Sequence, residues 1–206
     1  MSEGDFFSAE AKRATAASVR SAEAQTSAEI VVAVRKSSGR YGVLAYHFGL
    51  GLAAAVVAYL LLTPTEYSVE AIVLEGAVAF ALGSLLAANL DTVKRALSRG
   101  STLDANVHSG ARVAFFDLGI SRTSGRNGLL VYVSLFERRC VVLADIGIRD
   151  AELGPGWSAC GDQLADAVKR RDLALFERAI EELGRVLGAA HPRAADDVNE
   201  LPDEVQ

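Results

Sequence analysis

The stretch RNGLLVYVSLFERRCVVLADIGI, residues 126–148, decides the fold of this chain. It contains two short runs of β-branched and aromatic residues, which are separated by FERR at 136–139 and bounded by glycines. This arrangement is typical of a β-hairpin. Neither run alternates polar with apolar residues, so both faces of the sheet should be covered, as in the middle of a layered fold. The stretch therefore predicts an α/β protein built around this hairpin.

Helical and strand patterns surround the hairpin. A serine-capped helix is expected over 8–25, and a strand follows at 29–34. A further helix should end at Gly119 in a left-handed cap, and two helices should follow the hairpin, the last of them capped by Asp172. If the strands at 29–34 and 129–134 are parallel, a crossover connects them. The starts of these strands then lie at one edge of the sheet, and their ends lie at the opposite edge.

Two long apolar segments, 43–62 and 71–90, interrupt this pattern. Each spans about 30 Å as a helix, which is the thickness of a bilayer core. The first is apolar apart from His47 and two tyrosines, and a short turn at 63–68 joins the two. We therefore expect a transmembrane hairpin over 43–90 that contacts the lipid bilayer. A buried helix pair in a soluble protein is the alternative.

Basic residues flank the two segments on their outer sides. The connecting turn carries Glu66 and, at its edge, Glu70 instead. Because cytoplasmic flanks of membrane helices are rich in lysine and arginine, we expect a multi-pass protein of the inner (cytoplasmic) membrane with both termini in the cytoplasm. The flanking basic residues are Arg35, Lys36 and Arg40 before the first segment and Lys94, Arg95 and Arg99 after the second.

Small residues recur at helical spacing within both segments. They permit close packing of helices, either within one hairpin or between chains of a homo-oligomer. Glu75 lies inside the second segment, where an ionisable group is costly. We expect its carboxyl to reach the outer headgroups or, when protonated, to bond to Tyr59, and a part in an ion pathway is the alternative. The small residues are Gly49, Gly51, Ala53 and Ala55, then Ala79, Gly83 and Ala87.

The composition agrees with an anchored domain and excludes some classes of partner. The 206 residues are 50% hydrophobic and 23% charged, with a mean hydropathy of +0.23, which is more apolar than a soluble protein usually is. Much of the net charge of -5 comes from the acidic segment 192–206, which we expect to be disordered. No basic groove is visible, so we expect no nucleic acid partner.

Metal-binding and redox patterns are absent from the sequence. Cys140 and Cys160 lack a CxxC spacing, and we interpret them as buried free thiols. His108 and His191 lack partner ligands at the spacing that metal sites use. We therefore expect neither a metal nor a cofactor.

Several stretches together resemble the TPM domain family (TPM phosphatase-type domain). They are TSAEIVV at 26–32, FFDLGISRT at 115–123, RNGLLVYVSLFERR at 126–139, DIGI at 145–148 and Trp157. The resemblance is closest to bacterial members in which a transmembrane hairpin interrupts the domain after its first strand. It implies an αβα sandwich formed by 1–42 and 91–191, with the hairpin 43–90 inserted and the tail 192–206 outside.

The resemblance also implies a range of functions. Some TPM members outside this subgroup are described as acid phosphatases, others bind calcium, and others assist the assembly or repair of membrane complexes. This chain departs from the calcium-binding and phosphatase members, because its loops carry Arg122, Arg126 and Arg149 and few clustered carboxylates. Calcium needs six to eight oxygen ligands, so a calcium site is not expected here.

The candidate site lies at the edge of the sheet where these parallel strands begin, away from the inserted transmembrane hairpin. Arginines beside glycine-bearing loops hold phosphate or carboxylate groups, and Asp145 is the candidate acid, base or nucleophile. In the structural alternative, Asp145 bonds backbone amides of the following turn, and the residues before it shape the start of the strand. The expected binding residues are Arg122, Arg126, Asn127, Gly128, Asp145 and Gly147.

Two functions remain open from the sequence. The first is a membrane-anchored binding or assembly module that engages a protein partner. The second is a phosphatase that hydrolyses phosphate monoesters at the edge formed by Arg126, Asn127 and Asp145. At the opposite edge, the turn with Arg138 and Arg139 should lie near the membrane, either facing anionic headgroups or simply solvated.

Overall fold

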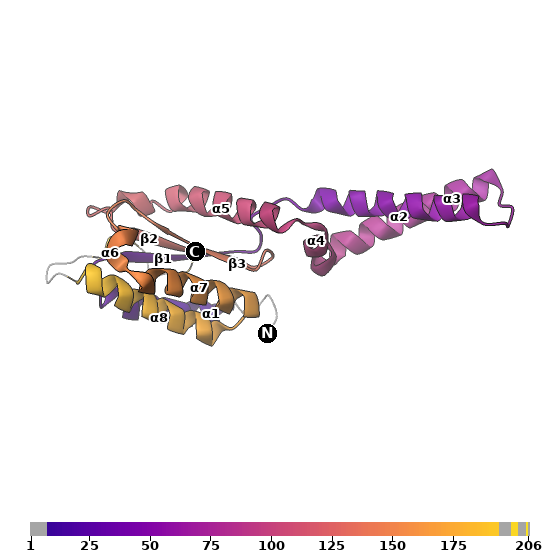
Figure 1. Cartoon of the computed structure of the whole chain (residues 1–206). Helices are drawn as coiled ribbons and strands as arrows, with labels where there is room; N and C mark the ends of the chain where they lie inside the picture. The colour runs from indigo at the N-terminus through magenta and orange to yellow at the C-terminus, as the bar shows by residue number, and fades with distance from the viewer. Residues whose placement is uncertain (1–7, 194–198, 202–204, 206) are drawn as a thin grey trace. The chain divides into compact units, whose positions relative to one another are not determined.

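The computed structural model describes residues 8–193, 199–201 and 205 of the chain (Figure 1). The chain divides into two compact units. The first unit takes its residues from both ends of the chain, up to Ser38 and again from Asp104 onward. The second unit is the segment between them, Gly39–Leu103.

A three-stranded mixed sheet forms the centre of the first unit. Its strands are β1 (Glu29–Arg35), β2 (Gly128–Ser134) and β3 (Arg139–Ala144), in the order β1-β2-β3. β1 and β2 are parallel, and β2 and β3 form an antiparallel hairpin. The expected hairpin and the expected parallel pairing are therefore both confirmed.

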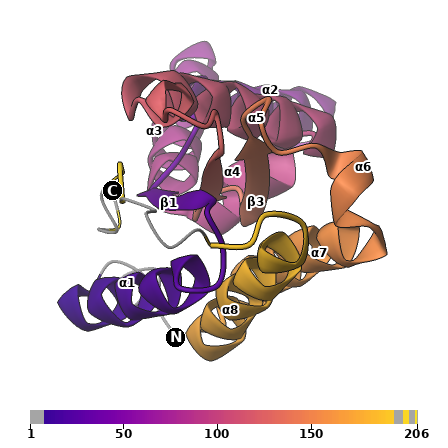
Figure 2. The same ribbon diagram turned by 90° about the vertical axis from the view of Figure 1, so that its left-hand side faces the viewer.

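Helices pack on both faces of this sheet (Figures 1 and 2). One face carries α1 (Ala9–Glu23), α7 (Pro155–Arg170) and α8 (Leu173–Ala190), whose apolar residues form a core with alternate side chains of β1 and β2. The remaining side chains of β1 and β2 meet α5 (Gly100–Asp117) on the other face. The protein is thus mostly helical with a small mixed sheet, which fits the expected α/β class loosely. Because helices cover both faces of the sheet, the strands show no alternation of polar and apolar residues.

The ends of the helices follow the signals in the sequence. Ser8 accepts a hydrogen bond from the amide of Ala11 at 3.0 Å, and Asp172 caps α8 in the same way. Gly119 has a φ of 70° and ends α5, after which the short 3-10 helix η2 (Ile120–Arg122) buries Ile120. A four-residue helix, α6 (Asp150–Leu153), precedes α7 and was not expected.

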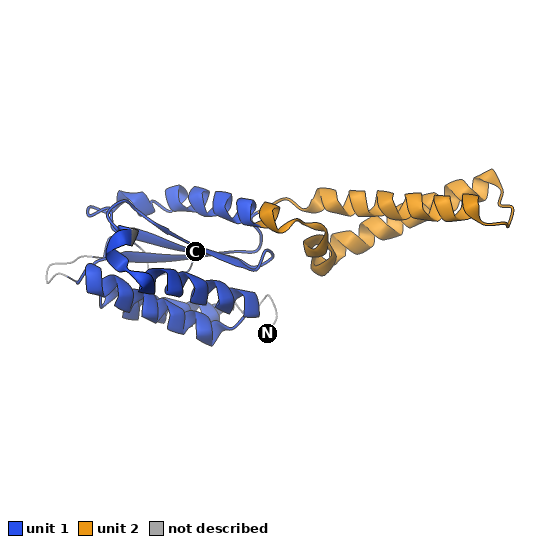
Figure 3. Cartoon of the chain, in the orientation of Figure 1, with its two compact units in different colours: residues 1–38, 104–206 blue, residues 39–103 orange. Residues whose placement is uncertain are grey.

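The second unit consists of α2 (Gly42–Leu62), α3 (Val69–Asn89) and the short α4 (Asp91–Leu97) (Figure 3). α2 and α3 are long and apolar enough to cross a membrane. Their most apolar stretches are only 17% and 22% buried, which differs from the buried helix pair that a soluble core contains. α4 was not expected from the sequence.

The small residues of the two long helices have different surroundings. Gly83 faces Gly49 and Leu52, so this part of the small-residue pattern serves packing within the hairpin. At Gly51, by contrast, nothing lies within 4 Å of the place where a Cβ would be. Glu75 is exposed on α3, and among the described residues no hydrogen bond joins it to Tyr59.

The expected disorder of 192–206 concerns mainly residues 194–198, 202–204 and 206, which lie outside the described part of the chain. The described residues beside them contact other parts of the first unit. Pro192 forms a β-bridge with Thr26, and the amide of Leu201 donates to the carboxylate of Glu29 at 3.3 Å.

Candidate functional site

The predicted catalytic candidate, Asp145, is held by a two-point ion pair with Arg126. Nε of Arg126 lies 2.7 Å from Oδ2 of Asp145, and Nη2 donates to Oδ1 at 3.0 Å. Oδ1 also accepts from the amide of Ile146 at 2.8 Å. The Asp145 side chain is only 4% exposed, whereas the Arg126 side chain is 48% exposed. Oδ1 is therefore hydrogen-bonded by groups of the chain itself, whereas Oδ2 has no hydrogen-bond partner in the described residues and is buried against the Arg126 guanidinium, whose side chain is exposed.

Asn127 connects the turn before β2 to the residues before β1 through hydrogen bonds. Its side-chain amide donates to the carbonyl of Ser27, and its backbone amide donates to Oγ1 of Thr123 at 3.1 Å. Its carbonyl accepts from the amide of Glu29 at 3.2 Å. These bonds fix where β1 begins beside β2, which is a structural task rather than a chemical one.

The two glycines of the predicted site allow backbones to approach closely. A Cβ on Gly147 would lie 2.5 Å from the carbonyl oxygen of Gly125, and the Gly147 amide donates to the carbonyl of Arg126 at 2.8 Å. A Cβ on Gly128 would lie 2.7 Å from Cγ2 of Ile120. Larger residues at either position would force these turns apart.

The structure thus brings five of the six predicted residues together at the start of β2 and the end of β3. Arg122 is exposed, and among the described residues no hydrogen bond or ion pair joins it to Asp145 or Arg126. Arg149, which the sequence placed nearby, pairs with Glu152 at 2.8 Å. The geometry favours the structural reading of Asp145, because an acid, base or nucleophile needs a carboxylate oxygen that a substrate can reach, and both oxygens of Asp145 are buried beneath Arg126.

The sequence did not predict a buried carboxylate, Glu137, in the turn between β2 and β3, at the opposite end of the strands from Asp145. We expected the turn between β2 and β3 to face headgroups or to be solvated, yet Glu137 is only 1% exposed. Its Oε1 accepts from the amide of Ser38 at 2.8 Å and from the hydroxyl of Ser37 at 3.4 Å, and its Oε2 accepts from the hydroxyl of Ser134. The spacing of Ser134 and Glu137, three residues apart as in a capping box, was the available signal.

The hydroxyls around Glu137 form a connected network. The Ser38 hydroxyl donates to Oγ of Ser134 at 2.7 Å and lies 3.0 Å from the hydroxyl of Tyr132. A Cβ on Gly110 of α5 would lie 2.6 Å from that tyrosine oxygen, so glycine makes room for it. The network fastens the chain that leaves β1 to the end of β2.

The neighbouring arginines are partly engaged. Nε of Arg139 lies 2.7 Å from Oδ1 of Asp104 in an exposed ion pair. Arg138 is half-buried and has a φ of 53°. Contact of this turn with headgroups stays a prediction.

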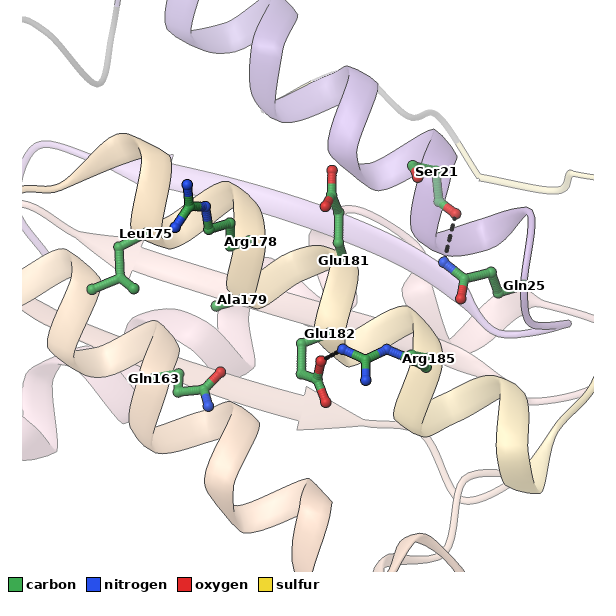
Figure 4. A pocket seen from close by; sticks show the side chains of 9 residues that line it. All are labelled: Ser21, Gln25, Gln163, Leu175, Arg178, Ala179, Glu181, Glu182 and Arg185. Atoms are coloured by element: carbon green, nitrogen blue, oxygen red, sulfur yellow. Dashed lines mark hydrogen bonds and ion pairs between the residues drawn. The ribbon is translucent and has the colours of Figure 1, made fainter.

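A polar hollow of about 420 Å³ lies between α1, α7 and α8 (Figure 4). Its charges are mixed, and Arg185 pairs with Glu182 within it. Figure 4 shows Arg178 and Glu181 on α8 and Gln163 on α7. Within the described ranges no three histidine, cysteine or acidic side chains gather as a metal ion requires. The hollow offers no group with an evident chemical task.

Both cysteines are free, as the sequence predicted. Burial raises the pKa of the Cys140 thiol to about 12 and also raises the pKa of Cys160. Since the thiolate is the reactive form, neither residue suits nucleophilic chemistry.

Comparison with known proteins identifies a shared fold but no family. No protein-family model and no curated protein matches the sequence. The chain is similar to the NMR structure of the BA42 protein from the psychrophilic bacterium Bizionia argentinensis, with a TM-score of 0.58. The two chains are 20% identical, and the alignment covers 96% of this chain and 92% of the other. This likeness concerns the fold alone, so the resemblance to TPM domains stays a hypothesis.

Proposed function

We propose that this protein is a TPM-like αβα domain anchored in the cytoplasmic membrane by α2 and α3, and that it acts as a binding or assembly module for a protein partner. The observation that carries the proposal is the pair of long apolar helices whose side chains are mostly exposed. The sheet unit then faces the cytoplasm, where partners of a membrane complex are reached.

The apolar surface of α2 and α3 supports membrane insertion. Large side chains such as Leu50, Leu61, Leu74 and Leu85 are more than half exposed. Moving one such side chain from water into an apolar phase is worth about 1.5–3 kcal/mol. A water-exposed hairpin with this surface would associate with other apolar material, whereas a bilayer accommodates it.

The charges at the ends of the hairpin support the orientation. Basic residues stand before α2 and again in and after α4, while the α2–α3 turn carries Glu66. The positive-inside rule then places the sheet unit and both chain ends in the cytoplasm.

The surroundings of the carboxylates at the two ends of the strands support binding over catalysis. Asp145 is engaged by Arg126 and by the amide of Ile146, and Glu137 is engaged by serine donors. A phosphatase would need one of these carboxylates, or a similar group, directed at the substrate. No specific contact in the described residues favours the phosphatase, and an assembly role needs only a shaped surface.

Cysteine labelling in intact cells tests the anchoring and its orientation. Glu66→Cys in the α2–α3 turn should react with a membrane-impermeant maleimide from outside, whereas Glu181→Cys on α8 should react only after lysis. Both variants are made with Cys140 and Cys160 replaced by serine, because Cys140 is only half-buried and lines a groove. Labelling of position 181 in intact cells, or extraction of the protein by alkaline carbonate, would overturn the proposal.

A hydrolysis assay tests the choice between the two functions. The full-length protein in detergent micelles should be inactive toward a generic phosphomonoester, and so should Asp145→Asn. Activity in the wild type that disappears in Asp145→Asn would establish the phosphatase instead. Activity that Asp145→Asn retains would identify a contaminant or another site.

A further inference from the structure

We propose that the open edge of β3 binds an extended segment of a partner protein, which joins the sheet as a fourth strand. This inference rests on the proposed binding function and names where and how the partner docks. It draws on the pairing of β3, on the groove beside it and on the charge of the groove wall.

The outer edge of β3 presents unpaired backbone groups. The amide of Asp145 donates to the carbonyl of Gly128 at 2.9 Å, which fixes the phase of the antiparallel ladder. The backbone groups of Cys140, Val142 and Ala144 therefore point away from β2. In the part of the chain that the structure describes, no strand pairs with them.

This edge also lacks the features that protect free strands. β1, at the other edge of the sheet, is buried along nearly its whole length, whereas every residue of β3 is half-buried. After Arg139, β3 reads CVVLA, without a proline, lysine or inward charge. Natural sheets usually block a free edge with such residues, and an unblocked edge serves as a template for another strand.

A groove of about 360 Å³ lies beside this edge. β3 contributes Cys140 and Val142, α7 contributes Trp157 and Gly161, and α5 contributes His108. Glycine inside a helix costs about 1 kcal/mol relative to alanine. Nothing in the described structure lies within 4 Å of the place where a Gly161 Cβ would be. The groove is therefore open beside Gly161, and a single methyl group there would leave it open.

The groove wall defines the chemistry of the partner. Asp162 lines the groove and, among the described residues, has no ion pair or hydrogen bond. A lysine or arginine of the partner would meet it there. The indole of Trp157 and the side chain of Val142 favour apolar residues at alternate positions of the partner strand.

A single extended segment suits the groove better than a second copy of this chain does. In a two-fold pairing of two β3 edges, α7 and α5 of one copy would approach the same helices of the other copy, because these helices line the groove beside β3. A lone strand brings no helices.

The test uses full-length protein in detergent micelles and a capped ten-residue peptide of alternating valine and threonine with one central lysine. Fluorescence of Trp157, the single tryptophan, reports binding. N-methylation of three alternate amides on one edge of the peptide should weaken binding about tenfold or more, because each removed donor costs a hydrogen bond. N-methylation on the opposite edge should leave the affinity unchanged.

Two matched variants examine the groove itself. Gly161→Phe should abolish binding by filling the groove, whereas Gly161→Ala should bind as the wild type does. On binding, hydrogen exchange should slow at the amides of Cys140, Val142 and Ala144. The inference is overturned if the peptide does not bind, if methylation of either edge has the same effect, or if Gly161→Phe still binds. These outcomes do not depend on the membrane, so they fail separately from the anchoring experiment.

Discussion

Replacing Glu137 should destabilise the sheet unit more than any exposed ion pair does. Glu137→Ala removes the acceptor of the Ser134 hydroxyl, which is buried with it, and of the amide of Ser38, which is half-buried. A buried donor left without a partner costs about 1–3 kcal/mol. Two such donors, partly relieved by rotation of the hydroxyl and by entering water, give an expected loss of about 3 kcal/mol.

A conservative change at the same position separates the hydrogen bonds from the packing. Glu137→Gln keeps an oxygen that accepts from the Ser38 amide and places an amide beside Ser134, whose hydroxyl can turn to accept from it. We expect a loss of about 1 kcal/mol for this variant. Asp166→Ala, which removes an exposed ion pair with Arg170, serves as the control and should cost about 0.5 kcal/mol at most.

Urea unfolding of the full-length protein in micelles, followed by Trp157 fluorescence, measures these losses. Trp157 is the single tryptophan and belongs to the sheet unit, so the signal reports that unit. With a slope of about 2 kcal/mol/M, a loss of about 3 kcal/mol lowers the midpoint by about 1.5 M. A midpoint for Glu137→Ala no lower than that of Asp166→Ala would refute the role assigned to the buried network.

Three further changes test packing, ionisation and thiol reactivity. Gly184→Ala should cost about 1–3 kcal/mol in the same assay, because its Cβ would lie 2.5 Å from Cβ of Ala22. An unchanged midpoint would show that α1 and α8 separate freely. Glu177→Gln should stabilise the protein at neutral pH. Burial and, to a smaller extent, repulsion from the neighbouring carboxylate of Glu181 raise the pKa of Glu177 above 4.5, so ionisation of Glu177 opposes folding. The free energy of unfolding of the wild type should fall as the pH rises above 4.5. If Glu177→Gln is still more stable than the wild type well below pH 4.5, the explanation is wrong. Cys140 and Cys160 should resist a disulfide reagent at mildly alkaline pH and react in urea, because burial raises both pKa values. Rapid reaction of the folded protein would argue against this burial.

The grouping of the candidate site followed from the sequence, but its internal pairing did not. Once the hairpin and the parallel strands are assigned, Asn127 and Asp145 must lie at the same end of the sheet. The ion pair between Arg126 and Asp145 joins residues that are 19 positions apart, and it depends on the direction that the Arg126 side chain takes in the folded protein. The buried position of Glu137 depends on Ser38, which lies 99 residues away along the chain.

The sequence by itself determined the strands of the hairpin, the helix caps and the two long apolar helices. These features depend on residues that are close along the chain, where side-chain periodicity and capping act directly on the backbone. Only the tertiary structure decided which carboxylates are occupied and which sheet edge is left open. Burial and pairing at those places depend on segments brought together from distant parts of the chain, and no local pattern records which segments meet.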